Sequence, residues 1–324
     1  MASNRSNNPL VSIIIPVFNE ENSVRIFVET TRKVLKEAHI TFEMIFVNDG
    51  SRDRTLERLL EHAESDERIR IINLSRNFGK ESALSAGIDS AVGEVLVPID
   101  VDMQDPPELI PLFLEHWKQG YDVVYGARAS RKDDAFTKRT SAAWFYRVFN
   151  RLSPLKIPVD AGDFRLIDRR VADVLKQMPE RNRFMKGLFS WVGFSSIAIP
   201  YERPPRSEGE TKWNHWKLWN YALDGLISFS TLPLRVWTYI GATIALLSFL
   251  YGSFIVIRTL LLGVDLPGYA SLLTTVLFLG GIQLLSIGVL GEYLGRLFIE
   301  AKGRPLYVVE STFPPTTTTD ASRG

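Results

Sequence analysis

Two long runs without a charged residue, both near the C-terminus, place the strongest limit on how this chain can fold. The first extends from Val236 to Ile257 and the second from Leu266 to Gly291. About 20 helical residues are enough to cross the roughly 30 Å hydrocarbon core of a bilayer. Neither run carries the polar stripe expected of a helix that packs on one face in a soluble core. We therefore predict two transmembrane helices, at about 236–257 and 268–291, within the segment 233–298.

The link between the two runs is short, so they should form a hairpin whose outer ends lie on the same side of the membrane. Basic residues flank these outer ends, namely Lys212, Lys217, Arg235, Arg296, Lys302 and Arg304. Positive charge favours the cytosolic side, and the polar start of the chain is unlike a cleaved signal peptide. We predict a protein of the plasma (inner) membrane with two spans, whose N-terminal domain and both termini are cytosolic.

Residues 10 to 127 alternate short apolar segments with amphipathic helical patterns. The strand-like segments read "LVSIIIPVF", "FEMIFVN", "IRIINLS", "EVLVPID" and "YDVVYGA". Such alternation predicts an α/β domain with a doubly wound, mostly parallel sheet. Ligands of these sheets bind beyond the carboxyl ends of the strands.

Polar groups follow each of the five predicted strands, in the segments 16–20, 48–51, 76–80, 100–104 and 126–128. Any one of them could be a helix cap or a turn, but all five should meet at one edge of the sheet. The chain lacks both a P-loop and a Rossmann G-x-G-x-x-G motif, which counts against a dehydrogenase. It also has no cysteine, which excludes thiolate nucleophiles and cysteine-ligated metals.

Two further segments combine aromatic residues at helical spacing with basic residues. They are residues 138–152, which contain "WFYRVF", and residues 213–232, which begin "WNHWKLW". This composition is typical of helices that lie in the membrane interface, although an aromatic stripe can also belong to an ordinary core. We predict amphipathic interfacial helices in both places.

The ordered set "PVFNE", "NDGS", "NFGK", "DVDMQDPPE", "GAR", "DAGDFRL", "RSEGETKW" and "LGEYLGR" resembles the inverting GT-A glycosyltransferases of family 2. More closely, it resembles the polyprenyl-phosphate (bactoprenol) glucosyltransferases, relatives of the dolichyl-phosphate mannose and glucose synthases. The resemblance covers roughly residues 10 to 308. It implies inverting transfer of glucose from UDP-glucose to polyprenyl (undecaprenyl) phosphate, giving β-glucosyl-phosphoryl-polyprenol on the cytosolic membrane face.

The resemblance also implies residue roles. The donor would be bound by Pro16, Asn19, Glu20, Asp49, Lys80, Asp100, Arg206 and Lys212. Mg²⁺ or Mn²⁺ would lie between the donor phosphates and Asp100, Asp102 and Gln104, in keeping with the preference of hard ions for oxygen ligands. Arg128 and Arg139 would bind the acceptor phosphate, and Asp163, Asp102 and Arg128 would form the catalytic set. Asp163 would orient the acceptor or act as a weak base, while Asp105 and the two following prolines would start the next helix.

The residue patterns and the resemblance together predict this domain organisation: a disordered N-terminus (1–9), a GT-A catalytic domain (10–212), a juxtamembrane helix (213–232), the hairpin (233–298), and a C-terminal segment with a disordered tail (299–324). The expected partners are UDP-glucose, a polyprenyl phosphate and the membrane, with no nucleic acid, and the chain should form a homo-oligomer such as a tetramer. Two alternatives stay open. The donor could be GDP-mannose, UDP-GlcNAc or UDP-4-amino-arabinose, or the protein could be a non-catalytic, membrane-anchored nucleotide-binding subunit.

Overall fold

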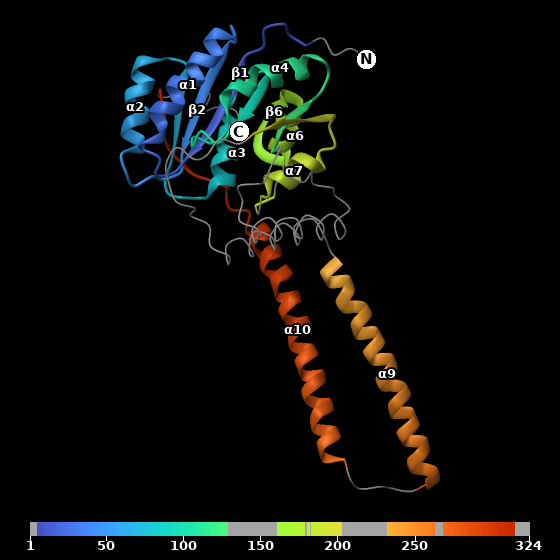
Figure 1. Cartoon of the computed structure of the whole chain (residues 1–324). Coiled ribbons are helices and arrows are strands. Elements are labelled where there is room, and N and C mark those ends of the chain that lie inside the picture. The colour runs from blue at the N-terminus through green and yellow to red at the C-terminus, as the bar shows by residue number, and fades with distance from the viewer. Residues whose placement is uncertain are drawn as a thin grey trace.

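The computed structural model describes residues 5–128, 161–202 except 179 and 182, 232–262 and 268–314. An α/β domain lies at one end of two long helices (Figure 1). Several predictions fall outside the described residues. They are the interfacial helices at 138–152 and 213–232, the tail from residue 315 onward, and the predicted site residues Arg139, Arg206 and Lys212.

The α/β domain is built on one eight-stranded sheet with the order β7-β5-β6-β4-β1-β2-β3-β8. Its strands are β1 (Val11–Val17), β2 (Phe42–Asn48), β3 (Ile69–Leu74), β4 (Val95–Pro98), β5 (Val123–Arg128), β6 (Ala161–Asp168), β7 (Ser196–Tyr201) and β8 (Val309–Phe313). The helices between the first five strands are α1 (Ser23–Glu37), α2 (Thr55–Ser65), α3 (Lys80–Ser90) and α4 (Ile110–Lys118), the last preceded by a 3-10 turn, η1 (Pro107–Leu109). The predicted doubly wound, mostly parallel sheet is confirmed.

Three strands were not identified from the sequence, and two of them interrupt the parallel pattern. Strand β6 runs antiparallel between β4 and β5, pairing Leu96 with Ile167 and Val124 with Leu166. Because β6 is antiparallel to both neighbours, β5 still points in the same direction as β4. Strand β8 comes from the end of the chain and pairs antiparallel with β3 at the sheet edge.

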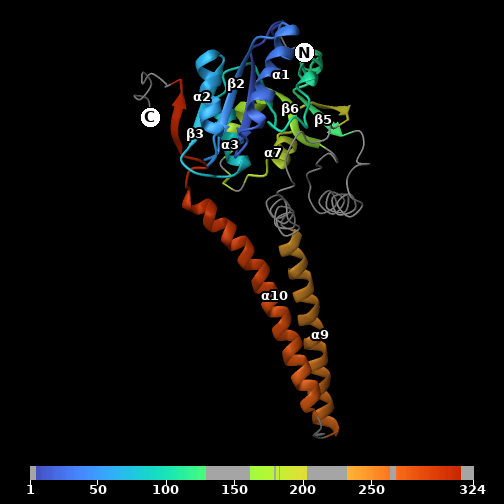
Figure 2. The same ribbon diagram turned by 60° about the vertical axis from the view of Figure 1, so that its left-hand side comes forward.

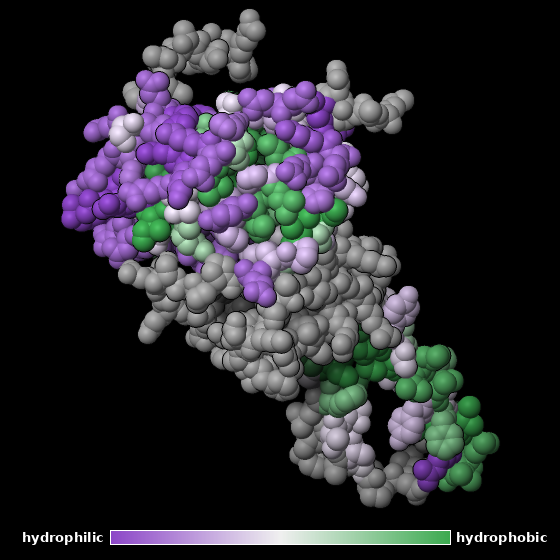
Figure 3. All heavy atoms as spheres, turned by 45° about the horizontal axis from the view of Figure 1, so that its top comes forward, coloured by the Kyte–Doolittle hydropathy of each residue, from purple (hydrophilic) through white to green (hydrophobic). Residues whose placement is uncertain are grey.

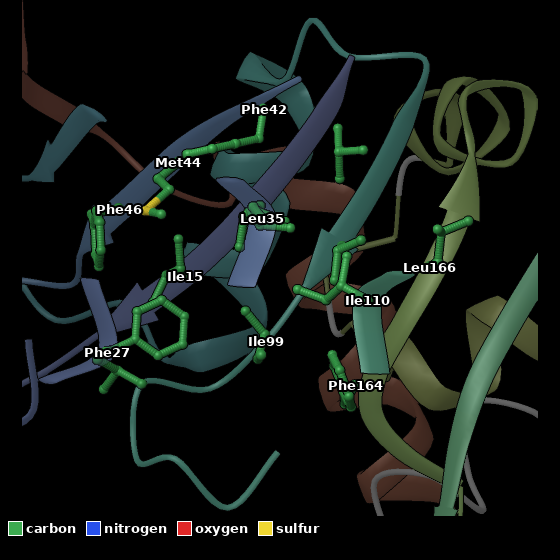
Figure 4. Packing of buried hydrophobic residues seen from close by; sticks show 14 of the residues in the cluster. Ile15, Phe27, Leu35, Phe42, Met44, Phe46, Ile99, Ile110, Phe164 and Leu166 are labelled. Carbon is green, nitrogen blue, oxygen red and sulfur yellow. The ribbon is translucent and has the colours of Figure 1, made fainter. Parts of the chain in front are cut away.

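Both faces of the central strands are covered, which explains why their sequences are continuously apolar rather than alternating. On one face, Phe27 of α1 packs edge-on against Phe46 of β2, with ring centroids 6.2 Å apart (Figure 4). On the other face, Ile14 and Ile45 belong to a second cluster with Ala83 and the rest of the buried side of α3. All seven residues of β2 are buried.

The N-terminal segment 1–9 was predicted to be disordered, yet Arg5 within it has a side chain only 7% exposed. Its guanidinium donates to Asp122 Oδ1 at 2.7 Å and lies over the ring of Trp117, 4.9 Å from the centroid. Trp117 in turn donates through Nε1 to Asp168 Oδ2 at 2.7 Å. Arg5 thus joins the end of α4 to the end of β6, a long-range contact with no local sequence signal.

The remaining helices are α6 (Arg169–Gln177), α7 (Met185–Trp191), α9 (Leu232–Leu262) and α10 (Tyr269–Lys302). Helices α9 and α10 contain the two uncharged runs and project away from the α/β domain (Figures 1 and 2). By length and composition, both are able to cross a membrane. Their large apolar side chains are exposed, as Leu262 at 79% illustrates. Figure 3 shows the contrast with the mainly hydrophilic surface of the α/β domain.

Gly87 gives a test of how α3 packs on the sheet. A Cβ at this position would lie 2.3 Å from Cγ2 of Ile14. Replacing a helical glycine by alanine normally stabilises a helix by about 1 kcal/mol, whereas overpacking a core costs about 1–3 kcal/mol. We expect Gly87→Ala to lower the free energy of unfolding of the full chain, measured by denaturant titration. A stabilisation would contradict the described packing.

Candidate active site

The functional side chains meet where the parallel strands end. Strands β1 to β5 point in one direction, so their carboxyl ends lie at the same edge of the sheet. Strand β6 runs the opposite way and therefore begins at this edge, where Ala161 pairs with Ala127 near the end of β5. This arrangement brings Asp163, near the start of β6, close to the residues that follow β4.

At this edge one lysine joins two carboxylates. Lys80 Nζ donates to Asp100 Oδ2 at 2.7 Å and to Asp163 Oδ2 at 2.8 Å. Lys80 is the first residue of α3, Asp100 follows β4, and Asp163 lies on β6. The lysine side chain is 43% exposed and each carboxylate 28% exposed, so the cluster stays accessible to a ligand. We call these three residues the Lys80 cluster.

The charges of the Lys80 cluster stabilise one another. Burial acts to raise the pKa of Asp163, but the ammonium groups of Lys80 and Lys186 outweigh it and hold this pKa well below its usual value. Burial likewise acts to lower the pKa of Lys80, while Asp100 and Asp163 together raise it well above its usual value. Asp163 is therefore an ionised carboxylate, and Lys80 an ammonium ion, throughout the neutral pH range.

Asp49 fixes the loop that leads to Lys80. Its two carboxylate oxygens accept the backbone N–H groups of Phe78 at 2.7 Å and of Gly79 at 2.9 Å. Gly79 has φ of 97°, a conformation that side chains disfavour. Burial is the largest influence on Asp49 and raises its pKa, partly offset by these two hydrogen bonds. Asp49 thus positions the start of α3, in addition to any contact with the donor predicted from the sequence.

A cavity of about 520 Å³ lies at the ends of β1, β2 and β3. Asn19, Asn48 and Asn73 line it, together with Glu310 of β8. Asn73 donates to Glu310 Oε2 at 2.9 Å and accepts from Asn48 Nδ2 at 2.8 Å. Asn48 Oδ1 in turn accepts from the backbone of Ser51 at 3.3 Å. A chain of hydrogen bonds therefore connects the C-terminal strand to the loop after β2.

The segment after β4 carries the predicted metal ligands. Gln104 donates its backbone N–H to Asp102 Oδ1 at 3.1 Å, across Met103, which adopts φ of 58°. Asp100 and Asp102 are both partly exposed. Within the described part of the chain, no group of three or more histidine or acidic side chains is arranged to hold a metal ion. Mg²⁺ and Mn²⁺ often need only one or two carboxylates when substrate phosphates complete the shell, and this donor set fits that case.

Asp105 does more than precede the next helix. Asp105 is 4% exposed, and its carboxylate accepts a hydrogen bond from the Tyr201 hydroxyl at 2.5 Å. Tyr201 ends β7, so this contact joins the segment after β4 to the outer strand of the sheet. The 3-10 turn η1 begins only at Pro107.

Three other predicted site residues are placed by their backbone contacts. Pro16 pairs with Val47 inside the sheet, and the Glu20 backbone donates to Thr55 Oγ1 at 2.8 Å. Arg128 ends β5, where its backbone is in register with Tyr201.

Several residues of the site were missed from the sequence. Lys186 of α7 lies 3.9 Å from Asp163 Oδ1. Arg165 donates to the carbonyl oxygen of Gly162 at 2.6 Å and stacks on Phe189, 4.0 Å from the ring centroid. Glu81, next to Lys80, is also close enough to feel the Asp163 charge. Only Arg165 and Glu81 had a signal, because Arg165 lies within the motif "DAGDFRL" and Glu81 directly follows "NFGK".

The family comparison agrees with this geometry. The profile of "Glycosyl transferase family 2" matches residues 12–175, and that of "GtrB C-terminal hairpin" matches residues 232–297. The chain belongs to glycosyl transferase family 2 and is a glycosyltransferase. The hairpin match and the two long apolar helices identify it as membrane-associated.

Three relatives are similar over nearly their whole length. An uncharacterized glycosyltransferase of Synechocystis is 55% identical over 92% of this chain and 94% of its own. The SfII prophage-derived bactoprenol glucosyl transferase of Shigella flexneri is 49% identical over 93% of this chain and 98% of its own. The prophage bactoprenol glucosyl transferase homolog of Escherichia coli is 48% identical with the same coverage. The predicted resemblance to this group is confirmed.

Glu81 gives a pH-dependent test of the site. Burial, and next the Asp163 charge, raise the pKa of Glu81 from 4.5 to about 7, against the opposing effect of Lys80 and Lys186. A carboxyl whose pKa is raised on folding contributes its full stability below the unfolded pKa and loses it as pH rises through the folded pKa. We expect the wild-type chain to lose about 3 kcal/mol relative to Glu81→Gln between pH 4.5 and 7.5, at about 1.4 kcal/mol per pKa unit. Unfolding titrations across this range measure the difference, and a difference that does not change with pH would contradict it.

Proposed function

We propose that this protein transfers glucose from UDP-glucose to a polyprenyl phosphate, with inversion, on the cytosolic face of the membrane. The observation that carries the proposal is the joint match of the family 2 profile and the GtrB hairpin profile to one chain. Relatives that share this organisation at 48–49% identity are named bactoprenol glucosyl transferases. The Lys80 cluster at the carboxyl edge of the sheet supplies the matching chemistry.

The donor is proposed to occupy the 520 Å³ cavity and extend toward the Lys80 cluster. The cavity offers amide and hydroxyl groups from Asn19, Asn48 and Ser51, which suit a nucleoside. The ammonium of Lys80 suits the negative charge of a diphosphate. Arg206 and Lys212 are proposed to contact the same diphosphate, and Pro16, Glu20 and Asp49 to shape the nucleoside end.

A divalent cation, Mg²⁺ or Mn²⁺, is proposed to be held by Asp100 and Asp102, with Gln104 beside them. When bound, such an ion neutralises negative charge on the departing diphosphate. Asp100 also accepts the Lys80 hydrogen bond, so the carboxylate has to share its oxygens between the ammonium and the ion. Two carboxylates together with donor phosphates form a sufficient oxygen shell.

Asp163 is proposed to orient the acceptor rather than remove a proton from it. Lys80 and Lys186 hold its pKa well below the usual value, and a carboxylate of such low basicity is a poor general base. A phosphate monoester has a second pKa of about 6 and is therefore largely dianionic at neutral pH. It can therefore attack the sugar without a strong base. Arg128 and Arg139 are proposed to bind this phosphate as bidentate donors.

The hairpin is proposed to span the inner membrane, with the α/β domain and both termini in the cytosol. Basic residues flank its outer ends, as the positive-inside rule requires. Gly280 and Gly288 of α10 have no other atom within 4 Å of an added Cβ. Such open glycine positions favour close packing of helices between copies, which supports a homo-oligomer.

The proposal is tested with the purified full chain, a polyprenyl phosphate, Mg²⁺ or Mn²⁺, and labelled UDP-glucose, GDP-mannose, UDP-GlcNAc and UDP-4-amino-arabinose in separate reactions. We expect label from UDP-glucose to enter the lipid fraction. Asp163→Asn should reduce the rate by about 10²-fold, because misplacing a reacting group by about 1 Å costs about this much. Asp102→Ala should reduce it as well.

Asp173→Asn is the matched control, since Asp173 lies on α6 with a side chain 51% exposed. It should leave the rate unchanged. Absence of transfer from every donor, together with an Asp163→Asn variant that behaves like the parent, would contradict the enzymatic proposal. Preference for another donor would contradict glucose as the sugar alone.

A further inference from the structure

A second cavity, of about 330 Å³, lies where α10 meets the α/β domain. It is lined by four cationic side chains, Arg76, Arg181, Lys302 and Arg304, together with Phe78 and Phe298 among its apolar residues. Lys302 is the last residue of α10 and of its candidate membrane span. Gly303, with φ of 59°, ends the helix and turns the chain toward Arg304. We call this cavity the basic pocket.

The cations of the basic pocket are held in place but not neutralised. The Arg76 guanidinium stacks on Phe78 at 4.0 Å from the ring centroid, and Lys302 Nζ lies 4.2 Å from that of Phe298. Arg181 donates through Nη2 to the Gly303 carbonyl oxygen at 3.3 Å. Over the described ranges of the chain, Arg76, Lys302 and Arg304 make no ion pair with a carboxylate.

Acidic side chains near the basic pocket only partly offset its charge. Glu300 Oε1 accepts the backbone N–H of Arg181 at 2.8 Å. Asp49, whose pKa burial raises and the Arg76 charge lowers, is a second carboxylate near the pocket. Four cations against these two carboxylates leave the basic pocket positive. A positive pocket with aromatic walls suits a ligand that combines a phosphate group with apolar chains.

The location of the basic pocket favours a membrane lipid over a soluble anion. The candidate membrane span of α10 ends at Lys302, where the helix reaches the α/β domain (Figures 1 and 2). The pocket, which Lys302 lines, therefore lies at the end of a span. Basic clusters at the cytosolic ends of spans attract anionic lipid headgroups. We propose that the basic pocket binds the phosphodiester headgroup of an anionic phospholipid of the surrounding membrane, such as phosphatidylglycerol.

The basic pocket is separate from the Lys80 cluster. Lys80, Asp100 and Asp163 are not among its lining residues, so a phosphate bound there does not contact the groups proposed to act on the reacting atoms. Arg76 nevertheless lines both this pocket and the 520 Å³ cavity. A bound headgroup would therefore share one guanidinium with the cavity proposed for the donor.

The test uses the full chain reconstituted in phosphatidylcholine bilayers, without donor or acceptor, so that its outcome does not depend on glycosyl transfer. Electron paramagnetic resonance measures the motionally restricted fraction of spin-labelled phosphatidylglycerol and of spin-labelled phosphatidylcholine. We expect phosphatidylglycerol to associate about fivefold more strongly than phosphatidylcholine, because one juxtamembrane cation contributes about this factor. In Lys302→Gln/Arg304→Gln this preference should fall below about twofold.

Three comparisons make the test specific to the basic pocket. Arg25→Gln/Lys33→Gln removes the same two charge types from the exposed face of α1 and should keep the preference. Leu306→Trp fills part of the pocket without changing its charge and should abolish the preference. Thermal unfolding of each variant reports whether it is folded.

A preference that survives both Lys302→Gln/Arg304→Gln and Leu306→Trp in folded protein would overturn the proposal. Displacement of phosphatidylglycerol by an equimolar amount of unlabelled polyprenyl phosphate would also overturn it, since the pocket would then belong to the acceptor. Displacement of phosphatidylglycerol by inorganic phosphate at about 10 mM, a low ionic strength, would overturn it too, because the pocket would then be a site for free phosphate. We expect neither competitor to act.

Discussion

The rest of the site depends on the two hydrogen bonds that the Lys80 ammonium donates to Asp100 and Asp163. The two carboxylates arrive from strands of opposite direction, β4 and β6, and would repel each other without a cation between them. Lys80 can reach both because Asp49 holds the preceding loop by its backbone N–H groups. The register of β6 against β4 and the start of α3 are thus linked through a single side chain.

This arrangement also explains how one edge of the sheet can serve both a donor and an acceptor. The cavity proposed for the nucleoside is bounded by β1, β2 and β3, and the proposed reacting groups follow β4 or lie on β6. The C-terminal strand β8 follows the hairpin, and its Glu310 lines this cavity and contacts Asn73. The membrane segment is therefore connected at both of its ends to the domain that it anchors.

Much of the fold and of the candidate site could be predicted from the sequence, because the patterns that indicate them lie within short segments of the chain. The buried strands β1 to β5 read as apolar runs, and α1 and α2 have amphipathic patterns with clear ends. Asp100, Asp163 and Lys80 were recognised through motifs, and the structure places them in contact. The family and the enzyme class followed from the same motifs.

The parts that could not be predicted depend on contacts between distant residues. Strand β6 joins the sheet between β4 and β5, out of sequence order. The sequence "AGDFRLID" does not indicate which strands it pairs with. Strand β8 is separated from its partner β3 by the whole hairpin. Arg5 and Asp105 looked like solvated or helix-starting residues, and only the folded chain shows that each is buried against a partner from another element.

A double-mutant cycle on Lys80 and Asp163 tests the central interaction most directly. The free energies of unfolding of Lys80→Met, Asp163→Asn and the double variant are compared with wild type at pH 7, with chelator and without nucleotide. Because Lys80→Met leaves two facing carboxylates and the double variant does not, we expect the double variant to be more stable than the summed single effects by about 1 kcal/mol or more. Additive effects, within about 0.3 kcal/mol, would contradict the account.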